Sequence, residues 1–475
     1  MTTCKKNRDY FCAKCRKENA LFGILQKKIP KVQYKYMKAA FLTLGCKVNF
    51  YETEKMMTDF QKHGFDIVEF GQGADICIIN TCTVTNIADR KSRQMLHRAK
   101  KKNPRSIVAA VGCYAESGGE ELLKDPSVDM VFSNRDKESI AEKVLEYMGS
   151  REVTEGDSLQ EAACGGQSDP VRDRTRKYIK IQDGCNQFCS YCMIPYVRGG
   201  GILSSREEED ILKEIRMVAQ EGYKEVVLTG IHLSSYGVDR SSEKQFVALK
   251  GRPLVALLQK INEIQGIERI RLGSLEPRII STEFMEGLME VTKLCPHFHL
   301  SLQSGCDATL KRMNRHYTAA EYREKCDMLR KYFEHPAITT DVIVGFPGET
   351  EEEFERTREF VIDIGFADVH VFSYSVRSGT KAAGMKDQVP PEVKHRRSEM
   401  LMAAARQGKI GFEEWFIGRE EKILFEEVHI IDGKEYLTGH NERYVMVKIP
   451  RDEAGTAGFT ENGMGSIRIQ KTNLI

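Results

Sequence analysis

The sequence predicts an α/β protein with three folded domains: an N-terminal doubly wound parallel sheet, a central partial (β/α)6 TIM-type barrel and a small C-terminal β-barrel. Apolar runs alternate with amphipathic stretches between residues 38 and 150, as in βαβ units. Six further β/α units follow within 177–390, and short alternating strands with Gly and Asn turns fill 417–475. A chain of 475 residues is also too long for one ordinary core.

Composition places the chain among globular proteins, since 41% of its residues are hydrophobic and 29% are charged. The sequence has no run of about eighteen apolar residues and no apolar signal core near its start. We therefore expect a cytoplasmic protein without a membrane partner. Fourteen cysteines in an intracellular chain indicate metal or redox chemistry rather than a disulfide framework.

Residues 1–36 form a basic segment without helical or strand periodicity. They carry ten Lys or Arg against two acidic residues. We expect a disordered tail, or an upstream misread start with Met37 as the true initiator. Cys12 and Cys15 form a lone C-x-x-C in it, but a zinc site needs a fourth ligand that the segment lacks.

In the first domain, expected at 37–149, three apolar runs each end in a cysteine. The cysteines are Cys46, Cys82 and Cys113, separated by 36 and 31 residues, which is close to the length of one βαβ unit. Parallel strands bring their carboxyl ends to one sheet edge, so we expect the three thiols to meet there. The alternative is three unrelated buried cysteines at strand ends. Cys77 lies inside its run and is expected in the core.

A basic stretch runs from Arg90 to Arg105 with eight Lys or Arg, His97 and no acidic residue. Such a helix could lie along RNA phosphates, or it could be only a solvated basic face. The expected RNA-binding residues of this stretch are Arg90, Lys91, Arg93, Arg98, Lys100 and Lys101.

A Ser, Gly, Asp and Glu-rich linker at 150–176, which includes Cys164, precedes the barrel domain expected at 177–390. The predicted strands of the barrel are 178–181, 225–231, 269–275, 297–305, 338–346 and 368–375. Cys295, Cys306 and Cys326 show no ligand spacing and are expected to be structural.

Directly after the first predicted barrel strand, DGCNQFCSYC holds Cys185, Cys189 and Cys192 at the spacing C-x-x-x-C-x-x-C. A structural zinc site takes four ligands, whereas a [4Fe–4S] cluster bound by three thiolates keeps one iron open for a substrate. The spacing resembles the radical-SAM superfamily, in which the open iron binds S-adenosylmethionine (SAM) and an electron from the cluster releases a 5′-deoxyadenosyl radical.

Polar and glycine-rich turns follow the other barrel strands, at the rim where barrels of this kind place functional groups. They are expected to hold SAM, and the residues are Thr229, Gly230, Ser274, Glu276, Gln303 and Gly345. Each of these residues could instead be needed only for the conformation of its own turn.

A helix predicted at 391–416 leads to the C-terminal strands at 417–475. This last segment has eight Lys or Arg against ten Asp or Glu, so an RNA contact there needs a local patch, for which we single out Arg443 and Tyr444. The block GHNERYVMVKI resembles the TRAM domain, a module associated with tRNA binding. The alternative is a purely structural cap.

LGCKVNFYETEKM, NTCTVTNIADRKSRQMLHRA and GCYAE, followed by the three-cysteine loop, resemble the radical-SAM methylthiotransferase family. The resemblance implies a second [4Fe–4S] cluster on Cys46, Cys82 and Cys113. GCKVN is most similar to the branch acting on N6-threonylcarbamoyladenosine at position 37 of tRNA, because the isopentenyladenosine branch usually reads GCQMN and the ribosomal-protein branch GCPKN. The sequence departs from the family pattern at one place. In the family a basic residue usually precedes a Ser-Arg pair, and this chain lacks that residue near Ser204, after the glycine run 199–201.

This resemblance implies an enzyme that methylthiolates C2 of the modified adenosine, with SAM as both methyl donor and radical source. The implied partners are a tRNA anticodon stem-loop, a sulfur source and a reductant such as flavodoxin or ferredoxin. The alternatives are isopentenyladenosine or a ribosomal-protein side chain as substrate, and a non-catalytic iron–sulfur protein that binds RNA or transfers electrons.

Overall fold

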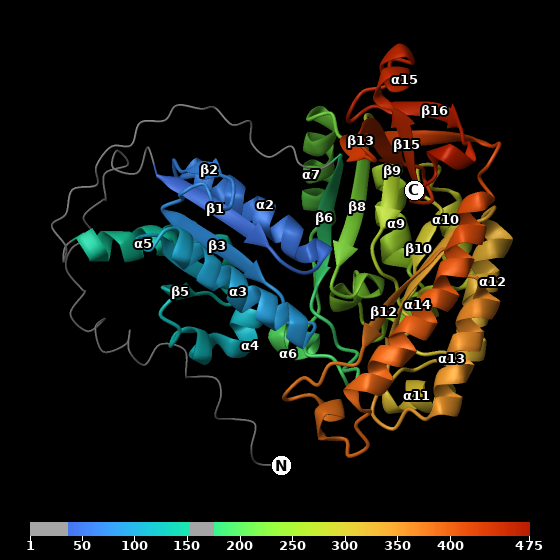
Figure 1. Cartoon of the computed structure of the whole chain (residues 1–475), viewed down its shortest axis with the longest axis horizontal. Helices are drawn as coiled ribbons and strands as arrows, with labels where there is room; N and C mark the ends of the chain where they lie inside the picture. Colours follow the sequence, from blue (N-terminus) through green and yellow to red (C-terminus); the bar gives the residue numbers. More distant parts are fainter. Residues whose placement is uncertain (1–36, 153–174) are drawn as a thin grey trace.

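The computed structural model describes residues 37–152 and 175–475, which form three parts along the chain (Figure 1). The predicted basic tail with Cys12 and Cys15, and most of the predicted linker with Cys164, lie outside the described residues. In the described part of the chain, no helix has the length and apolar character that a membrane crossing requires.

The N-terminal part is a five-stranded parallel sheet with the order β2-β1-β3-β4-β5. Its strands are β1 (Lys38–Thr43), β2 (Asp66–Val68), β3 (Ile76–Thr81), β4 (Ile107–Gly112) and β5 (Met130–Val131). This order is doubly wound, as predicted, and its topological switch point lies between β1 and β3. Ligands in such sheets bind outside the carboxyl ends of the strands at that point.

Alternate residues along these strands pack against different helices, because successive strand side chains point to opposite faces. Phe41 and Ile78 share one core with residues of α2 (Lys47–Lys62) and α5 (Ile140–Glu152). Ile79 and Val108 share the other core with residues of α3 (Asn86–Lys102) and α4 (Cys113–Leu122). Cys77 lies in this second core, as predicted.

The central part is the predicted partial barrel. It consists of β6 (Arg176–Asp183), β7 (Ser204–Ser205), β8 (Glu225–Gly230), β9 (Arg269–Leu272), β10 (His297–His299), β11 (Ala337–Val344) and β12 (Asp368–Ser373). The sheets β7-β6-β8-β9 and β10-β11-β12 are joined by parallel bridges such as Leu275 to Leu300. The wall stays open, because β12 pairs with β11 alone among the described strands.

Helices cover the outside of the barrel wall (Figure 1). The four-residue α6 (Ile194–Val197) lies apart from them, beside α4 of the N-terminal part. The covering helices are α7 (Glu208–Gln220), α8 (Phe246–Leu249), α9 (Arg252–Asn262), α10 (Thr282–Met289), α11 (Asp307–Arg312), α12 (Ala319–Tyr332), α13 (Glu351–Ile364) and α14 (Pro391–Glu414). One large apolar core joins them to the strands. Cys295, Cys306 and Cys326 are buried, consistent with a structural role.

The C-terminal part is antiparallel, with the order β15-β14-β13-β16. Its elements are β13 (Glu420–Ile431), β14 (Lys434–His440), β15 (Met446–Pro450), α15 (Arg451–Thr456) and β16 (Met464–Arg468). Arg269 and Arg271 of β9 donate to the carbonyls of His440 and Glu442, both at 3.0 Å. The sheet therefore packs against the amino-terminal end of the barrel and leaves the carboxyl-terminal rim free.

A buried carboxylate holds this junction together. Glu225 accepts from Arg176 at 2.9 Å and from Arg271 at 3.0 Å. Burial alone would raise the pKa of Glu225, but Arg271 and Arg176 lower it to about 2. The carboxylate is therefore ionised at neutral pH and compensates two buried guanidinium groups.

Candidate functional site

Cys185, Cys189 and Cys192 lie in the loop that leaves β6 at the rim of the barrel, where the sequence predicted them. Gly184 begins this loop with φ of +78°, and a Cβ there would lie 1.9 Å from the carbonyl oxygen of Ile202. Only glycine fits that turn. The three thiols are close enough to interact electrostatically, so the loop gathers three sulfur donors at one point.

Contacts from the helix region after β10 fix the conformation of this cysteine loop. Ser190 donates from its backbone to the carbonyl of Met313 at 3.0 Å and from its hydroxyl to that of Arg312 at 2.8 Å. The Arg315 guanidinium lies 3.3 Å from the Cys189 sulfur and 2.9 Å from the Tyr317 hydroxyl. Sequence reasoning missed Arg315, because nothing in the block SLQSGCDATLKRMNR marks which of its cations faces the cysteines.

The second trio of cysteines also converges. Cys46 precedes α2, Cys82 follows β3 and Cys113 begins α4, and the three interact electrostatically with one another. A Cβ on Gly45 would lie 2.9 Å from the Cys82 sulfur, so the close approach requires glycine beside Cys46. Cys46 is exposed, and the other two are buried.

Both trios suit metal clusters. Burial raises the pKa of Cys82 and of Cys185 to about 11, so these thiols carry their protons unless a metal displaces them. Neither trio forms a disulfide, since all six cysteines are free. Three thiols are the ligand set of a [4Fe–4S] cluster with one open iron.

Arg198 links the second cysteine trio to the barrel. Its side chain is almost fully buried and lies 3.4 Å from the Cys113 sulfur through Nε. The guanidinium also donates to Asn49 at 2.8 Å and pairs with Asp183 at 3.3 Å, and these residues stand close to Cys46 and Cys185 along the chain. The N-terminal sheet edge and the barrel rim are thereby held face to face.

Glu52 neutralises the cations at this junction. It pairs with Arg198 at 2.8 Å, with Lys180 at 2.9 Å and, more closely, with Lys137. Burial alone would raise the pKa of Glu52, but Arg198, Lys137 and Lys180 hold it well below its usual range. Sequence reasoning missed the whole network, because its members are up to 146 residues apart.

The six residues predicted to hold SAM lie where β8, β9, β10 and β11 end, on the same rim as the cysteine loop. Thr229, Glu276 and Gln303 are buried, and Ser274 is exposed. The backbone conformation requires glycine at position 345, because φ of Gly345 is +69° and a Cβ there would lie 2.4 Å from the Lys394 side chain. Contact of these residues with SAM remains a prediction.

His232 lies two residues after Gly230, and sequence reasoning did not single it out. Its Nδ1 lies 2.6 Å from the Ser235 hydroxyl, while its buried Nε2 has no partner among the described residues. Burial, followed by Arg315 and Arg278, lowers the pKa of His232 to about 3, so the ring is neutral. An unpaired buried nitrogen at this rim fits a site for a polar cofactor such as SAM.

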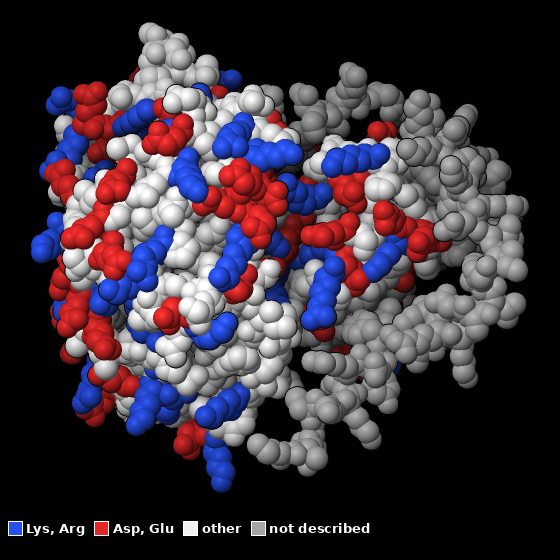
Figure 2. Space-filling model, turned by 180° about the vertical axis from the view of Figure 1, so that it is seen from behind, with Lys and Arg blue, Asp and Glu red and all other residues white. Residues whose placement is uncertain are grey.

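Helix α3 presents the basic face that the sequence predicted. Arg90, Lys91, Arg98 and Lys101 are exposed. Two other predicted cations have protein partners: Lys100 pairs with Asp129 at 2.8 Å, and Arg93 donates to the Tyr114 hydroxyl at 3.2 Å. In contrast, the face drawn in Figure 2 mixes Lys and Arg with Asp and Glu.

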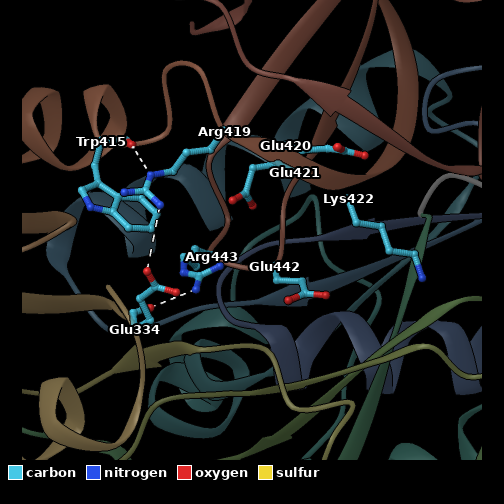
Figure 3. Close-up of a pocket in the computed structure, with 8 residues that line it drawn as sticks. All are labelled: Glu334, Trp415, Arg419, Glu420, Glu421, Lys422, Glu442 and Arg443. Atoms are coloured by element: carbon cyan, nitrogen blue, oxygen red, sulfur yellow. Dashed lines mark hydrogen bonds and ion pairs between the residues drawn. The ribbon is translucent and has the colours of Figure 1, made fainter.

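The two C-terminal residues predicted to contact RNA take part in internal contacts. Arg443 donates to the carbonyls of His335 at 3.0 Å and Glu334 at 2.9 Å, beside a cleft of about 480 Å³ that Trp415 and Arg419 also line (Figure 3). The Tyr444 ring lies 5.0 Å from the Arg176 guanidinium and 4.9 Å from that of Arg271, and it stacks on the His440 ring. RNA contact by either residue remains a prediction.

Exposed apolar side chains occur on the segments that follow both cysteine regions. Val84 and Ile87 follow Cys82 and are 57% and 67% exposed. Phe188 lies between two cysteines of the loop, and Tyr196 stacks edge-on against it at 5.7 Å. Within the glycine run 199–201, a Cβ on Gly201 would lie 2.7 Å from the Phe188 ring, so that position requires glycine.

A partial barrel with three cysteines in the loop after its first strand defines a radical-SAM enzyme, and comparison with known proteins agrees. The Radical SAM superfamily model matches residues 179–361, and the model for Uncharacterized protein family UPF0004 matches residues 38–133. The chain belongs to the radical-SAM tRNA methylthiotransferase family. The cofactors of this family are [4Fe–4S] clusters and SAM.

Three relatives illustrate the similarity. The threonylcarbamoyladenosine tRNA methylthiotransferase of Bacillus subtilis is 39% identical over 86% of this chain and 89% of its own length. That of Aquifex aeolicus is 38% identical over 86% and 98%. The tRNA-2-methylthio-N(6)-dimethylallyladenosine synthase of Thermoanaerobacter sp. is 36% identical over 87% of each chain.

Among solved structures, the radical SAM methyltransferase TsrM from Kitasatospora setae, with cobalamin and a [4Fe–4S] cluster bound, has a TM-score of 0.49 at 13% sequence identity. The match covers 72% of this chain and 75% of that one.

Proposed function

We propose that this enzyme transfers a methylthio group to C2 of N6-threonylcarbamoyladenosine at position 37 of tRNA. The observation that carries the proposal is that Arg198 joins the sheet edge that bears one cysteine trio to the barrel rim that bears the other. Two of the relatives act, by their names, on threonylcarbamoyladenosine in tRNA. The sequence GCKVN around Cys46 favours the same substrate over isopentenyladenosine or a protein side chain.

The chemistry explains why two cysteine trios are needed. The C2–H bond of adenine is neither acidic nor electrophilic, so acid–base or nucleophilic groups have little to act on. When bound, a SAM cluster on Cys185, Cys189 and Cys192 supplies the radical, and an auxiliary cluster on Cys46, Cys82 and Cys113 supplies the sulfur. A sulfur source and a reductant would restore the enzyme between turnovers.

The protein itself orients these groups. Arg315 and Arg198 each place a guanidinium against a cysteine sulfur, at 3.3 Å from Cys189 and 3.4 Å from Cys113, and so help to fix the positions of these two sulfur atoms. Exposed Phe188 and Tyr196 offer aromatic faces for a base splayed out of the anticodon loop. Their position beside the cysteine loop would bring such a base to the reacting groups.

We further infer domain boundaries at 37–149, 177–390 and 417–475, with a connecting helix at 391–416. The antiparallel sheet at the C-terminus is proposed as a TRAM-like module, and the anticodon stem-loop as the ligand of the assembled enzyme in the cytoplasm.

Deleting the gene should remove 2-methylthio-N6-threonylcarbamoyladenosine from cellular tRNA, and expression of the chain should restore it. Mass spectrometry of nucleosides from digested tRNA measures both changes. If the deletion removed 2-methylthio-isopentenyladenosine instead, the proposed substrate would be wrong, whereas the proposed reaction, methylthiolation of tRNA, would be correct.

Charge reversal on α3 tests its contact with tRNA. Replacing Lys91, Arg98 and Lys101 by glutamate should weaken tRNA binding, because these exposed cations have no acidic partner among the described residues. The plot of log affinity against log salt should become shallower, by about 0.9 in slope for each phosphate that is no longer neutralised. The matched control reverses Lys325 and Lys331 on α12 and Arg406 on α14, two helices that lie on the side of the barrel away from α3 (Figure 1). Equal affinity and slope in the α3 variant and the wild type would reject the assignment.

A further inference from the structure

Side chains on the inner face of the barrel form a polar cluster that the proposed chemistry does not use. We call it the lumen cluster, and it consists of Lys47, His299, Asp341 and His370. The last three come from the adjacent parallel strands β10, β11 and β12, where Asp341 is the register partner of His370. Ring nitrogens and carboxylate oxygens of these three residues lie within 4.8 Å of one another.

The two histidines and the aspartate face the space inside the barrel. Val369 and Val371, which flank His370, pack into the core between strands and helices. Because strand side chains alternate, His370 points the opposite way, into the lumen, and it is exposed there. His299 lies 3.3 Å from Asp341, shares a hydrogen bond with the Thr339 hydroxyl, and stacks on the His370 ring at 5.9 Å.

Lys47 reaches the same space from the N-terminal domain. It follows Cys46 as the first residue of α2, and this helix packs against β6 and β8. The Lys47 ammonium lies within electrostatic reach of Arg271 and Arg176, and of the carboxylates of Glu225 and Asp341. It is exposed, and within the part of the chain that the structure describes it makes no hydrogen bond or ion pair. A cation beside the proposed sulfur-bearing site is thus left for a ligand.

The charges around Asp341 decide which ligand fits. Two histidines and a carboxylate resemble the donor set of a divalent metal, but an ammonium within electrostatic reach of the same carboxylate opposes a second cation. Binding of an anionic ligand is favoured instead, because Lys47 can pair with the anion and the two histidines can donate hydrogen bonds to it. Asp341 then remains free to accept from a hydroxyl or an N–H group.

We propose that the lumen cluster binds the N6 substituent of the substrate adenine, recognising a carboxylate together with neighbouring hydroxyl and N–H groups. This inference rests on the proposed function, and it names the residues that select the substrate. An apolar isopentenyl group in the same place would leave Lys47 and His370 without a polar partner among the described residues. A site built for polar groups rejects such analogues far more strongly than an apolar pocket rejects a polar one.

The test compares two anticodon stem-loop RNAs, one with N6-threonylcarbamoyladenosine and one with N6-isopentenyladenosine at position 37, using the reconstituted enzyme. Lys47→Met should raise Kd and KM for the threonylcarbamoyl RNA about 10- to 100-fold, the effect of losing one charged hydrogen bond. Binding of the isopentenyl RNA should change little or tighten. Fluorescence anisotropy gives Kd, and mass spectrometry of the product gives KM.

Lys62→Met in the last turn of the same helix is the matched control and should behave as wild type. His370→Phe is a second variant in case the change beside Cys46 disturbs the auxiliary cluster. Iron content and cluster absorbance verify that each variant is folded and carries both clusters. Unchanged Kd in both variants, with wild type active on the threonylcarbamoyl RNA, would overturn the inference alone. Inactivity of wild type on that RNA would overturn the proposed function. Stoichiometric zinc that disappears in Asp341→Asn would show a metal site instead.

Discussion

Replacing Cys189 by alanine is expected to reduce cleavage of SAM to background. Cys189 is the central cysteine of the loop, and Arg315 holds its sulfur at 3.3 Å. Without that thiolate, two sulfur donors remain, which are too few to retain a cluster with one open iron. The measurement is 5′-deoxyadenosine formed from SAM under reducing conditions, and thiolated tRNA should vanish with it.

Replacing Cys82 by alanine is expected to separate the two activities. Cys82 belongs to the other trio and is buried beside Gly45. SAM cleavage should therefore persist, whereas methylthiolated tRNA should not form. Cys77→Ala is the matched control, because Cys77 is buried in the same sheet but takes part in neither trio. If the Cys82 variant still made product, the assignment of the second trio would be wrong.

The arrangement of strands and cysteines was predictable because it depends on local pattern. Each strand that leads to a cysteine is recognisable in the sequence as an apolar run. Because parallel strands run in the same direction, their carboxyl ends, and the cysteines that follow them, lie at one edge of the sheet. The spacing of Cys185, Cys189 and Cys192 likewise lies within eight residues. These features need no knowledge of how the domains pack.

Residues that join the domains could not be predicted in this way. Arg198 and Glu52 are 146 positions apart, and neither stands in a pattern that identifies its partner. Lys100 illustrates the opposite error, since sequence alone shows a cation on a basic helix, while folding places Asp129 against it at 2.8 Å. Charge counts along a chain do not reveal which charges the fold neutralises.

Arg198 is the position where a single change should affect both halves of the site. It lies 3.4 Å from the Cys113 sulfur and pairs with Glu52 and Asp183. Arg198→Met removes the guanidinium but keeps much of the side-chain volume. Breaking a buried ion pair from one side costs about 3 to 5 kcal/mol, so the free energy of unfolding should fall measurably. Chemical denaturation of the variant and the wild type measures that difference.

The same variant should also impair the auxiliary site more than the SAM site. Removing a partner beside a ligand typically lowers metal affinity or activity about 10- to 100-fold, so product formation should fall by that factor. SAM cleavage should be less affected, because Arg315 and not Arg198 contacts the rim cysteines. Arg216→Met, on the exposed face of α7, is the matched control.

Arg198→Lys should recover part of the stability, since the charge remains. It should recover little of the product formation, because one ammonium cannot contact Cys113, Asn49 and Glu52 together. Equal reduction of SAM cleavage and product in Arg198→Met would mean that the residue supports the fold alone and does not organise the second trio.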